Sequence, residues 1–471
     1  MVVDVLIAEI GSTTTCVNAF DGIENSGSGD AGVGSTARFL GQGISRTTIS
    51  EEDVRIGLNG ALANLKKNLG TRELTWQSFY ATSSAAGGLR MTVHGLVYDM
   101  TARAAKEAAL GAGANIHQVT AGKMRERDIE TLLKIKPNII LLAGGVDYGE
   151  RDTVIYNSSK IAEALNGNGL SIPVLYGGNI DAADEVRDIF SGCFGKLTVI
   201  PNIYPRIDEL NVAPAREIIQ ELFEEHIVTA RGMEHIREMV DGPILPTPGG
   251  VMLAAQLLKE EIGDLVVFDV GGATTDIHSV TAGSDKINRI QTSPQPEAKR
   301  TVEGDLGVFV NRKNILKNID LERRAVTFPD GKEAFFQNVE NLGEIPGTEE
   351  EKIAVEILTQ CALETALRRH AGGYRILYGN GGRTIAAEGK DLTNVKYCIG
   401  TGGALTRLGT GKEIMERILK GGSVPTDRKK YLYPPEDSRC LLDNHYIMAS
   451  LGVLSKRRPA AALKLLKESI Q

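Results

Sequence analysis

Two short segments of the sequence, 260 residues apart, combine an acidic side chain with glycine and a run of hydroxyl residues. The first consists of Glu9, Gly11, Ser12, Thr13 and Thr14, and the second of Asp269, Gly271, Gly272, Thr274 and Thr275. A carboxylate can bind a hydrated magnesium ion, glycine lets the backbone approach a ligand closely, and successive N–H and hydroxyl groups donate to phosphate oxygens. Two such turns facing each other would hold a nucleoside triphosphate from both sides, with Glu9 and Asp269 at the metal.

The alternative interpretation of these segments is purely structural. In it, the glycines only close hairpins and the threonines are ordinary strand residues. The spacing favours the functional interpretation, because a shift of 260 residues superimposes one segment on the other. The same shift also places Asp4 on Asp264 and Thr15 on Thr275. The chain therefore reads as an internal duplication, with one phosphate-binding turn in each half.

A third glycine turn follows the apolar residues 397–399 and contains Gly400, Gly402 and Gly403. A base and a ribose could lie there against backbone that carries no side chains. We therefore predict a nucleoside site at this turn, and the alternative is a plain connection from a strand to a helix.

Strands and helices must position these turns, and the apolar pattern predicts both. Residues 2–20 and 264–276 each read as a strand, a turn and a second strand. The segments between them alternate, with helical patterns at residues 51–69, 102–110 and 125–134 and apolar runs ending in paired glycines at 139–145 and 172–178. This alternation predicts a mostly parallel α/β sheet covered by helices. Glycine pairs at 375–382 and 396–403 echo those of the first half.

The length of 471 residues predicts two to four domains, and 42% hydrophobic residues suffice for more than one core. We place the first lobe, with insertions, at residues 1–245 and the second at 246–471. A G-x-G-x-x-G string at Gly27, Gly29 and Gly32 lies in a loop-like segment. It lacks the flanking strand and helix that a dinucleotide site requires.

Charge and cysteine usage bound the partners and the compartment. A net charge of −7 predicts no attraction to nucleic acid or anionic lipid. No apolar run reaches the 18 or so residues of a membrane span, and the N-terminus lacks the basic residues of a signal peptide, so we expect a cytoplasmic protein. The five cysteines are scattered without a C-x-x-C pair, which favours neither a zinc site, a disulfide framework nor an iron–sulfur cluster.

The three glycine turns resemble the nucleotide motifs of the actin, sugar kinase and heat-shock ATPase superfamily. Residues 9–15 resemble its first phosphate motif, 269–276 its second and 399–404 its adenosine motif. Residues 245–255 and 443–452 are similar to its two connecting helices. The resemblance implies two duplicated ribonuclease-H-like domains around a nucleotide cleft, with ATP and Mg²⁺ as cofactors.

Two departures from that superfamily concern catalysis. Glu9 stands where an Asp is usual, and Leu245 stands where the chaperone ATPases carry a Glu that orients water. Slow ATP hydrolysis, or the use of another acid, is therefore expected. The candidate catalytic acids are Asp269, Asp276 and Asp147, and the sequence leaves the choice among them open.

Five strings spread along the chain resemble the glutamate mutase accessory (MutL-type) protein family. They are residues 4–15, 81–91, 142–147, 201–206 and 301–307. This resemblance implies an adenosylcobalamin-dependent aminomutase as partner, such as glutamate mutase or ornithine aminomutase. It also implies ATP-driven reactivation, in which damaged cobalamin is expelled from the mutase. The chain has no D-x-H-x-x-G string and is not expected to carry cobalamin permanently.

Other functions are compatible with the same superfamily. A small-molecule kinase is the main alternative. It would need a carboxylate base in the cleft, and Asp147 and Asp276 are the candidates. An actin-type filament protein is a second alternative. A 2-hydroxyacyl-CoA dehydratase activator would share an iron–sulfur cluster between two subunits, and the scattered cysteines argue against it.

Overall fold

The structure is a computed structural model of the chain. It describes residues 1–23, 36–48, 53–84, 89–227, 233–317, 328–329, 331–344, 346–379, 382–421 and 430–471. The glycine-rich string at Gly27, Gly29 and Gly32 lies outside the described residues, as does part of the string 81–91.

The first sheet has five strands in the order β10-β4-β1-β2-β3. Its strands are β1 (Val2–Ile10), β2 (Thr14–Asp21), β3 (Arg38–Arg46), β4 (Thr75–Ser83) and β10 (Leu245–Pro246). Strands β1, β2 and β3 pair antiparallel, whereas β4 and β10 continue the sheet in parallel. Helix α1 (Val54–Asn68) begins after the N-cap Asp53 and packs on β2 and β3.

The second sheet repeats this arrangement in the order β13-β12-β11-β16-β17. Its strands are β11 (Leu265–Val270), β12 (Thr275–Val280), β13 (Ala298–Glu303), β16 (Tyr397–Thr401) and β17 (Arg439–Leu442). The directions match strand by strand, and so does the register: Glu9 pairs with Cys16, and Asp269 with Asp276. The predicted α/β fold with two duplicated ribonuclease-H-like sheets is confirmed.

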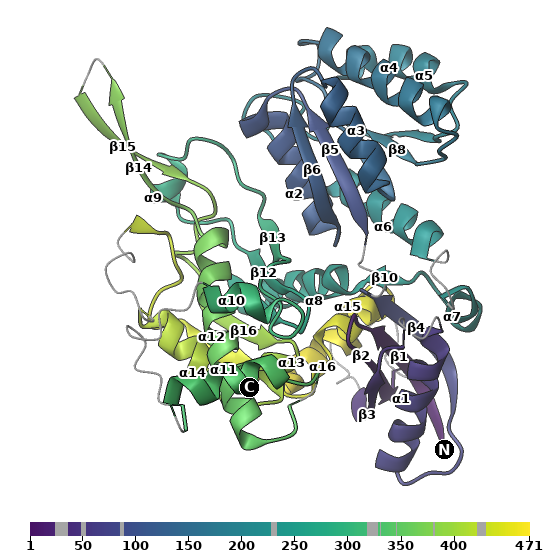
Figure 1. Ribbon diagram of the computed structural model, residues 1–471, viewed down its shortest axis with the longest axis vertical. Helices are drawn as coiled ribbons and strands as arrows, with labels where there is room; N and C mark the ends of the chain where they lie inside the picture. Colours follow the sequence, from purple (N-terminus) through teal and green to yellow (C-terminus); the bar gives the residue numbers. More distant parts are fainter. Residues whose placement is uncertain are drawn as a thin grey trace.

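Helices cover the second sheet on the side away from the first (Figure 1). They are α10 (Arg312–Lys317), α11 (Gly331–Asn341), α12 (Glu349–His370), α13 (Gly403–Thr406) and α14 (Gly411–Leu419). Helix α9 (Asp285–Asn288), between β12 and β13, instead packs through Ile287 against Ala387 and Leu432. Helix α12 begins with a capping box, in which Thr348 and Glu351 each accept from the backbone N–H of the other.

Two helices join the sheets. Helix α8 (Thr247–Ile262) leads from β10 to β11, and α15 (Met448–Ser455) follows β17 before α16 (Pro459–Ser469) ends the fold. Helices α8 and α15 cross at Gly250 and Gly452. A Cβ on Gly452 would lie 1.8 Å from the Gly250 carbonyl oxygen, so only glycine allows this approach. The sequence predicted the second helix from residue 443. It begins later because the Asp443 carboxylate instead accepts from the N–H groups of the first turn.

A third sheet is inserted in the first half, in the order β6-β5-β7-β8-β9, and all of its strands are parallel. Its strands are β5 (Arg90–Gly95), β6 (Asn115–Ala121), β7 (Ile139–Leu142), β8 (Val174–Tyr176) and β9 (Leu197–Val199). Its helices are η3 (Tyr98–Ala102), α2 (Arg103–Gly111), α3 (Glu126–Ile135), α4 (Asp152–Gly167), η4 (Ile180–Ala182) and α5 (Ala183–Phe190). Figure 1 shows this inserted sheet as a separate layer beyond α8. Helices α6 (Ala213–Ile227) and α7 (Met233–Met239) return the chain to β10.

This insertion corrects one expectation. The paired-glycine segments 139–145 and 172–178 belong to the inserted sheet and are not counterparts of 375–382 and 396–403. The described residues of 375–382 lie in a separate pair of strands, β14 (Gly373–Gly379) and β15 (Gly382–Glu388), which projects from the second half (Figure 1). Among the described residues, no helix is long and apolar enough to cross a bilayer.

Candidate nucleotide-binding site

The two acid–glycine–hydroxyl turns are closed by the same backbone hydrogen bond. The Gly11 N–H donates to the Thr14 carbonyl at 3.0 Å, and the Gly271 N–H donates to the Thr274 carbonyl at 2.9 Å. The turns also face each other, because a Cβ built on Gly272 would lie 3.3 Å from Cγ2 of Thr13 in the other half. The duplicated sheets thus bring the two predicted turns to one place.

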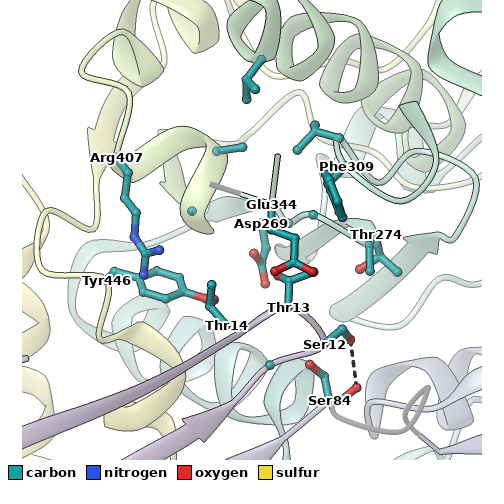
Figure 2. A pocket seen from close by; sticks show the side chains of 18 of the residues that line it. Ser12, Thr13, Thr14, Ser84, Asp269, Thr274, Phe309, Glu344, Arg407 and Tyr446 are labelled. Carbon is teal, nitrogen blue, oxygen red and sulfur yellow. Dashed lines mark hydrogen bonds between the residues drawn. The ribbon is translucent and has the colours of Figure 1, made fainter. Parts of the chain in front are cut away.

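A cavity of about 240 Å³ lies between the turns. One part of its wall carries acids and hydroxyls, including Glu9, Ser12, Thr13, Thr14, Ser84, Thr247, Asp269, Thr274 and Asp276. Another part is apolar, with Val308, Phe309, Leu342, Val355, Ala404 and Leu408. Figure 2 shows the hydroxyl side chains and Asp269 on one side of the cavity and Phe309 above them. Such a division suits a ligand with a charged end and an apolar ring.

Two acids of the cavity, Glu9 and Asp269, have raised pKa values. Glu9 is 5% exposed, and its Oε1 accepts a hydrogen bond from the Tyr446 hydroxyl at 2.8 Å. Burial raises the pKa of Glu9 to about 7, although the hydrogen bond from Tyr446 opposes the shift. Burial raises the pKa of Asp269 well above its usual range, and the charges of Asp276 and Glu9 add to the effect. A cation in the cavity would relieve this clustering of negative charge.

The donor set fits a hard cation held only partly by protein. Glu9 and Asp269 offer the carboxylate oxygens that Mg²⁺ prefers. In the part of the chain that the structure describes, no group of three or more His, Cys, Asp or Glu side chains could hold a metal ion by itself. A magnesium ion here would therefore need water and phosphate oxygens as its remaining ligands.

Arg407 adds positive charge to the cavity wall. Its guanidinium lies 5.2 Å from the centre of the Tyr446 ring, and its Nη2 donates to Sγ of Cys16 at 3.4 Å. No salt bridge of Arg407 to a carboxylate is found among the described residues. Its charge is thus available to an anionic ligand.

Most of the predicted site residues line this cavity. They are Glu9, Gly11, Ser12, Thr13, Thr14, Asp269, Gly271, Gly272, Thr274, Asp276 and Gly403. Asp276 is also paired, because Arg300 Nε donates to its Oδ1 at 2.8 Å and the Thr274 hydroxyl donates to its Oδ2 at 2.8 Å. Its carboxylate is therefore engaged on both oxygens.

Four predicted residues lie outside the cavity wall. The Thr275 hydroxyl points into the fold and donates to the Leu306 carbonyl at 2.7 Å. Gly400 is packed against Leu442, where a Cβ would approach to 2.8 Å. Gly402, with φ of +83°, leaves room for Asp269, whose Oδ1 would lie 2.6 Å from an added Cβ. Both glycines therefore shape the strand end.

The fourth is Asp147, which follows β7 in the inserted sheet. Its Oδ1 accepts from the Ile180 N–H at 3.0 Å and from Asn202 Nδ2 at 2.8 Å, so it ties loops of that sheet together. This place argues against Asp147 as a base for a ligand between the turns. Leu245, the departure from the chaperone ATPases, is 2% exposed in the apolar core and offers no group that could align water.

Sequence reasoning missed several cavity residues. Arg407 follows the predicted motif 399–404 by three residues. Tyr446 lies within the predicted connecting segment 443–452, where it adopts the left-handed conformation with φ of +51°. Glu344 reaches the cavity from a loop, and its Oε2 pairs with Arg46 Nε of the first half at 2.7 Å. Ser84 accepts through its carbonyl from the Ser12 hydroxyl at 3.1 Å (Figure 2). None of these four residues belongs to a local sequence pattern that is typical of a ligand-binding site.

Comparison with known proteins identifies the family. The family model described as MutL protein matches residues 5–470. The chain belongs to the MutL family. Protein MutL of Clostridium tetanomorphum is 36% identical over 477 aligned residues, covering 98% of each chain. The resemblance carried by the five sequence strings is thereby confirmed.

Solved structures give weaker likenesses. A glycerol dehydratase reactivase is 11% identical, with a TM-score of 0.32 over 96% of this chain and 100% of its own. The diol dehydratase-reactivating factor in its nucleotide-free form is 12% identical, with a TM-score of 0.34 over 96% and 99%. Because these TM-scores are low, the fold assignment rests on the strand topology of this chain.

Proposed function

We propose that this chain is an ATP-dependent reactivating factor for an adenosylcobalamin-dependent aminomutase. The observation that carries the proposal is the cavity between two duplicated acid–glycine–hydroxyl turns, in a chain of the MutL family. ATP would bind between the turns, and its hydrolysis would change how the halves hold each other. A difference in affinity for the mutase between the two nucleotide states could then open the mutase and release damaged cobalamin.

Each part of the nucleotide has a complementary part of the wall. The turn N–H groups and the hydroxyls of Ser12, Thr13 and Thr14 would donate to phosphate oxygens, and Arg407 would offset their charge. Gly403 leaves open space, since only Arg407 Nη1 comes within 4 Å of a Cβ placed there, at 3.9 Å. The ribose and base would lie at this turn and against the apolar wall.

Glu9 and Asp269 would hold Mg²⁺, which would neutralise charge that develops on the phosphates. Asp269 is also the acid best placed to position water, because Asp276 is engaged by Arg300. With Leu245 unable to orient water, we expect slow phosphate release from the chain alone. Release would rise when an inactivated mutase completes the closure of the halves.

We base the proposed partner class and compartment on membership of the MutL family. A mutase subunit carrying inert cobalamin is the expected partner, glutamate mutase and ornithine aminomutase being the specific candidates. The expected compartment is the cytoplasm. A small-molecule kinase is less well supported, because Asp276 is already paired and Asp147 lies in the inserted sheet.

The test is recovery of an aminomutase inactivated by turnover. The inactive holoenzyme is incubated with this chain, ATP, Mg²⁺ and fresh adenosylcobalamin, and both mutase activity and released cobalamin are measured. We expect recovery only with ATP and Mg²⁺, and none with the Asp269→Asn variant, which keeps the side-chain shape. Recovery without nucleotide, or phosphate transfer to a small alcohol in place of recovery, would contradict the proposal.

A further inference from the structure

The inserted sheet meets the second half at a buried cluster of charged residues. Helix α2 packs against the edge strand β13. Lys299 Nζ of that strand lies 2.9 Å from Glu107 Oε1 of α2, and Arg216 Nη2 of α6 donates to the Ala298 carbonyl at 2.6 Å. Lys299 and Glu107 have side chains only 10% and 8% exposed. This junction is therefore a specific, desolvated contact between the two bodies.

Arg300 of this junction also contacts a residue of the cavity wall, Asp276. Arg300 is 1% exposed, and its Nη2 lies 2.5 Å from Asp276 Oδ1, an acid of the cavity wall. From the same guanidinium, Nη1 donates to the Leu110 carbonyl at 3.2 Å and to the Ala114 carbonyl at 3.1 Å. One planar group thus holds the cavity wall and the end of α2 at once.

The bonds from Arg300 lie at the C-terminal end of α2, where the Leu110 carbonyl also accepts from the Gly113 N–H. The last carbonyls of a helix lack partners within it, and a cation there is favoured by the helix dipole. Helix α2 has no basic residue in its own last turn. Arg216 of α6 places one guanidinium against Gly111 at this end of the helix, and Arg300 supplies a second positive charge from another sheet. Arg300 thereby ties the end of α2 to Asp276.

We propose that Arg300 is a positioning residue that couples the nucleotide cavity to the inserted sheet. Entry of a nucleotide and its cation changes the charge beside Asp276. The strength of the ion pair between Asp276 and Arg300 changes with it. Arg300 passes this change to the end of α2 and to β6, which follows Ala114 directly. The inserted sheet is thereby the part of the molecule that reports nucleotide state to a partner. This inference rests on the proposed function.

The coupling is reciprocal by thermodynamic necessity. If bound nucleotide changes the affinity of the inserted sheet for a partner by some factor, the bound partner changes the affinity for nucleotide by the same factor. A coupling of the usual size corresponds to at least about a fivefold change. This supplies a route by which an inactivated mutase bound at the inserted sheet alters the ATP site.

The test is hydrogen exchange of the full chain with and without ATP and Mg²⁺, read on peptides covering residues 103–121. ATP binding by the same samples is measured by titration calorimetry. The variants are Arg300→Gln and Lys299→Gln, the same replacement at neighbouring positions. Both remove a charged contact between β13 and α2, but only the first lies next to the cavity. Lys299→Gln is therefore the matched control for a loosened junction.

We expect ATP to change exchange at residues 103–121 by about fivefold or more in the unaltered chain and in Lys299→Gln. In Arg300→Gln, ATP should still bind, but this change should be lost. If Arg300→Gln does not fold, Arg300→Lys serves, since a single ammonium cannot span Asp276 and both carbonyls. ATP binding without a change at α2, or an undiminished change in the Arg300 variant, would overturn the coupling alone. Absence of ATP binding to the unaltered chain would remove the proposed function as well.

Discussion

The two halves share strands, register and turns, yet they fill one equivalent position with different chemistry. In the first half, Asn18 lies opposite Gln42, and Gln42 Nε2 donates to Asn18 Oδ1 at 2.8 Å. In the second half, His278 lies opposite Arg300, which binds the acid Asp276. The neutral amide of Gln42 therefore stands where the other half has the buried cation Arg300.

The difference follows what each strand edge contacts. Gln42 reaches the backbone before α15, with Nε2 3.3 Å from the Tyr446 carbonyl, and so joins the halves through uncharged groups. Arg300 reaches carbonyls of the inserted sheet. Duplication thus explains the paired turns, whereas the asymmetry explains how Arg300 of the second half makes charged contacts with the insertion.

The largest expected effect is a difference in stability between variants of Arg300 and of Gln42. Arg300→Ala should lower the free energy of unfolding by about 3–5 kcal/mol, because it leaves Asp276 buried without its partner. Gln42→Ala should cost about 1 kcal/mol, the net value of neutral hydrogen bonds. Urea denaturation of both variants measures the contrast. Equal losses would mean that the charged junction has no special role.

The glycine turns give the next contrast. A Cβ on Gly11 would lie 2.6 Å from the Thr14 carbonyl oxygen, whereas on Gly271 the nearest atom, the Thr274 carbonyl oxygen, is 3.4 Å away. Gly11→Ala should therefore destabilise the fold by about 1–3 kcal/mol, the usual cost of overpacking. Gly271→Ala should be nearly neutral. Thermal unfolding of the two variants tests this, and a more damaging change at Gly271 would contradict the geometry.

Much of this comparison could be predicted from sequence. The apolar runs and the 260-residue offset of Glu9 and Asp269 predicted the duplicated strands correctly. A buried strand and its glycine turn consist of consecutive residues, so a local pattern is enough to identify them. The inserted sheet was not separated from the first half. Paired glycines after a short apolar run look alike in any parallel sheet, and the sheet to which they belong is set by distant pairing.

Side-chain direction and distant contacts limited the prediction of the site. Thr274 and Thr275 are neighbours, but successive strand residues point to opposite faces, and only Thr274 lines the cavity. Asp276 was predicted as a free acid, because its partner Arg300 lies on another strand. Arg407 and Tyr446 come from elements far along the chain from Glu9, and no local spacing links them.

A smaller effect concerns the acids themselves. Carboxylates bind metal only when deprotonated, and the pKa of Glu9 is about 7. Below that pH a proton competes with the cation, so Mg²⁺-dependent ATP affinity should rise as the pH increases from 6 to 8. The Glu9→Gln variant should show a pH slope lower by about one proton. Calorimetry across this pH range measures the slope, and the same slope in both proteins would exclude Glu9 from the metal site.

The central claim is that ATP and Mg²⁺ bind between the duplicated turns. Calorimetric titration of ATP into the unaltered chain and into Asp269→Asn, each with Mg²⁺ and with EDTA, tests it most directly. We expect Mg²⁺ to strengthen binding to the unaltered chain, and we expect Asp269→Asn to lose most of that gain while binding in EDTA stays the same. Absence of ATP binding to the folded, unaltered chain, or an equal response of both proteins to Mg²⁺, would contradict the account.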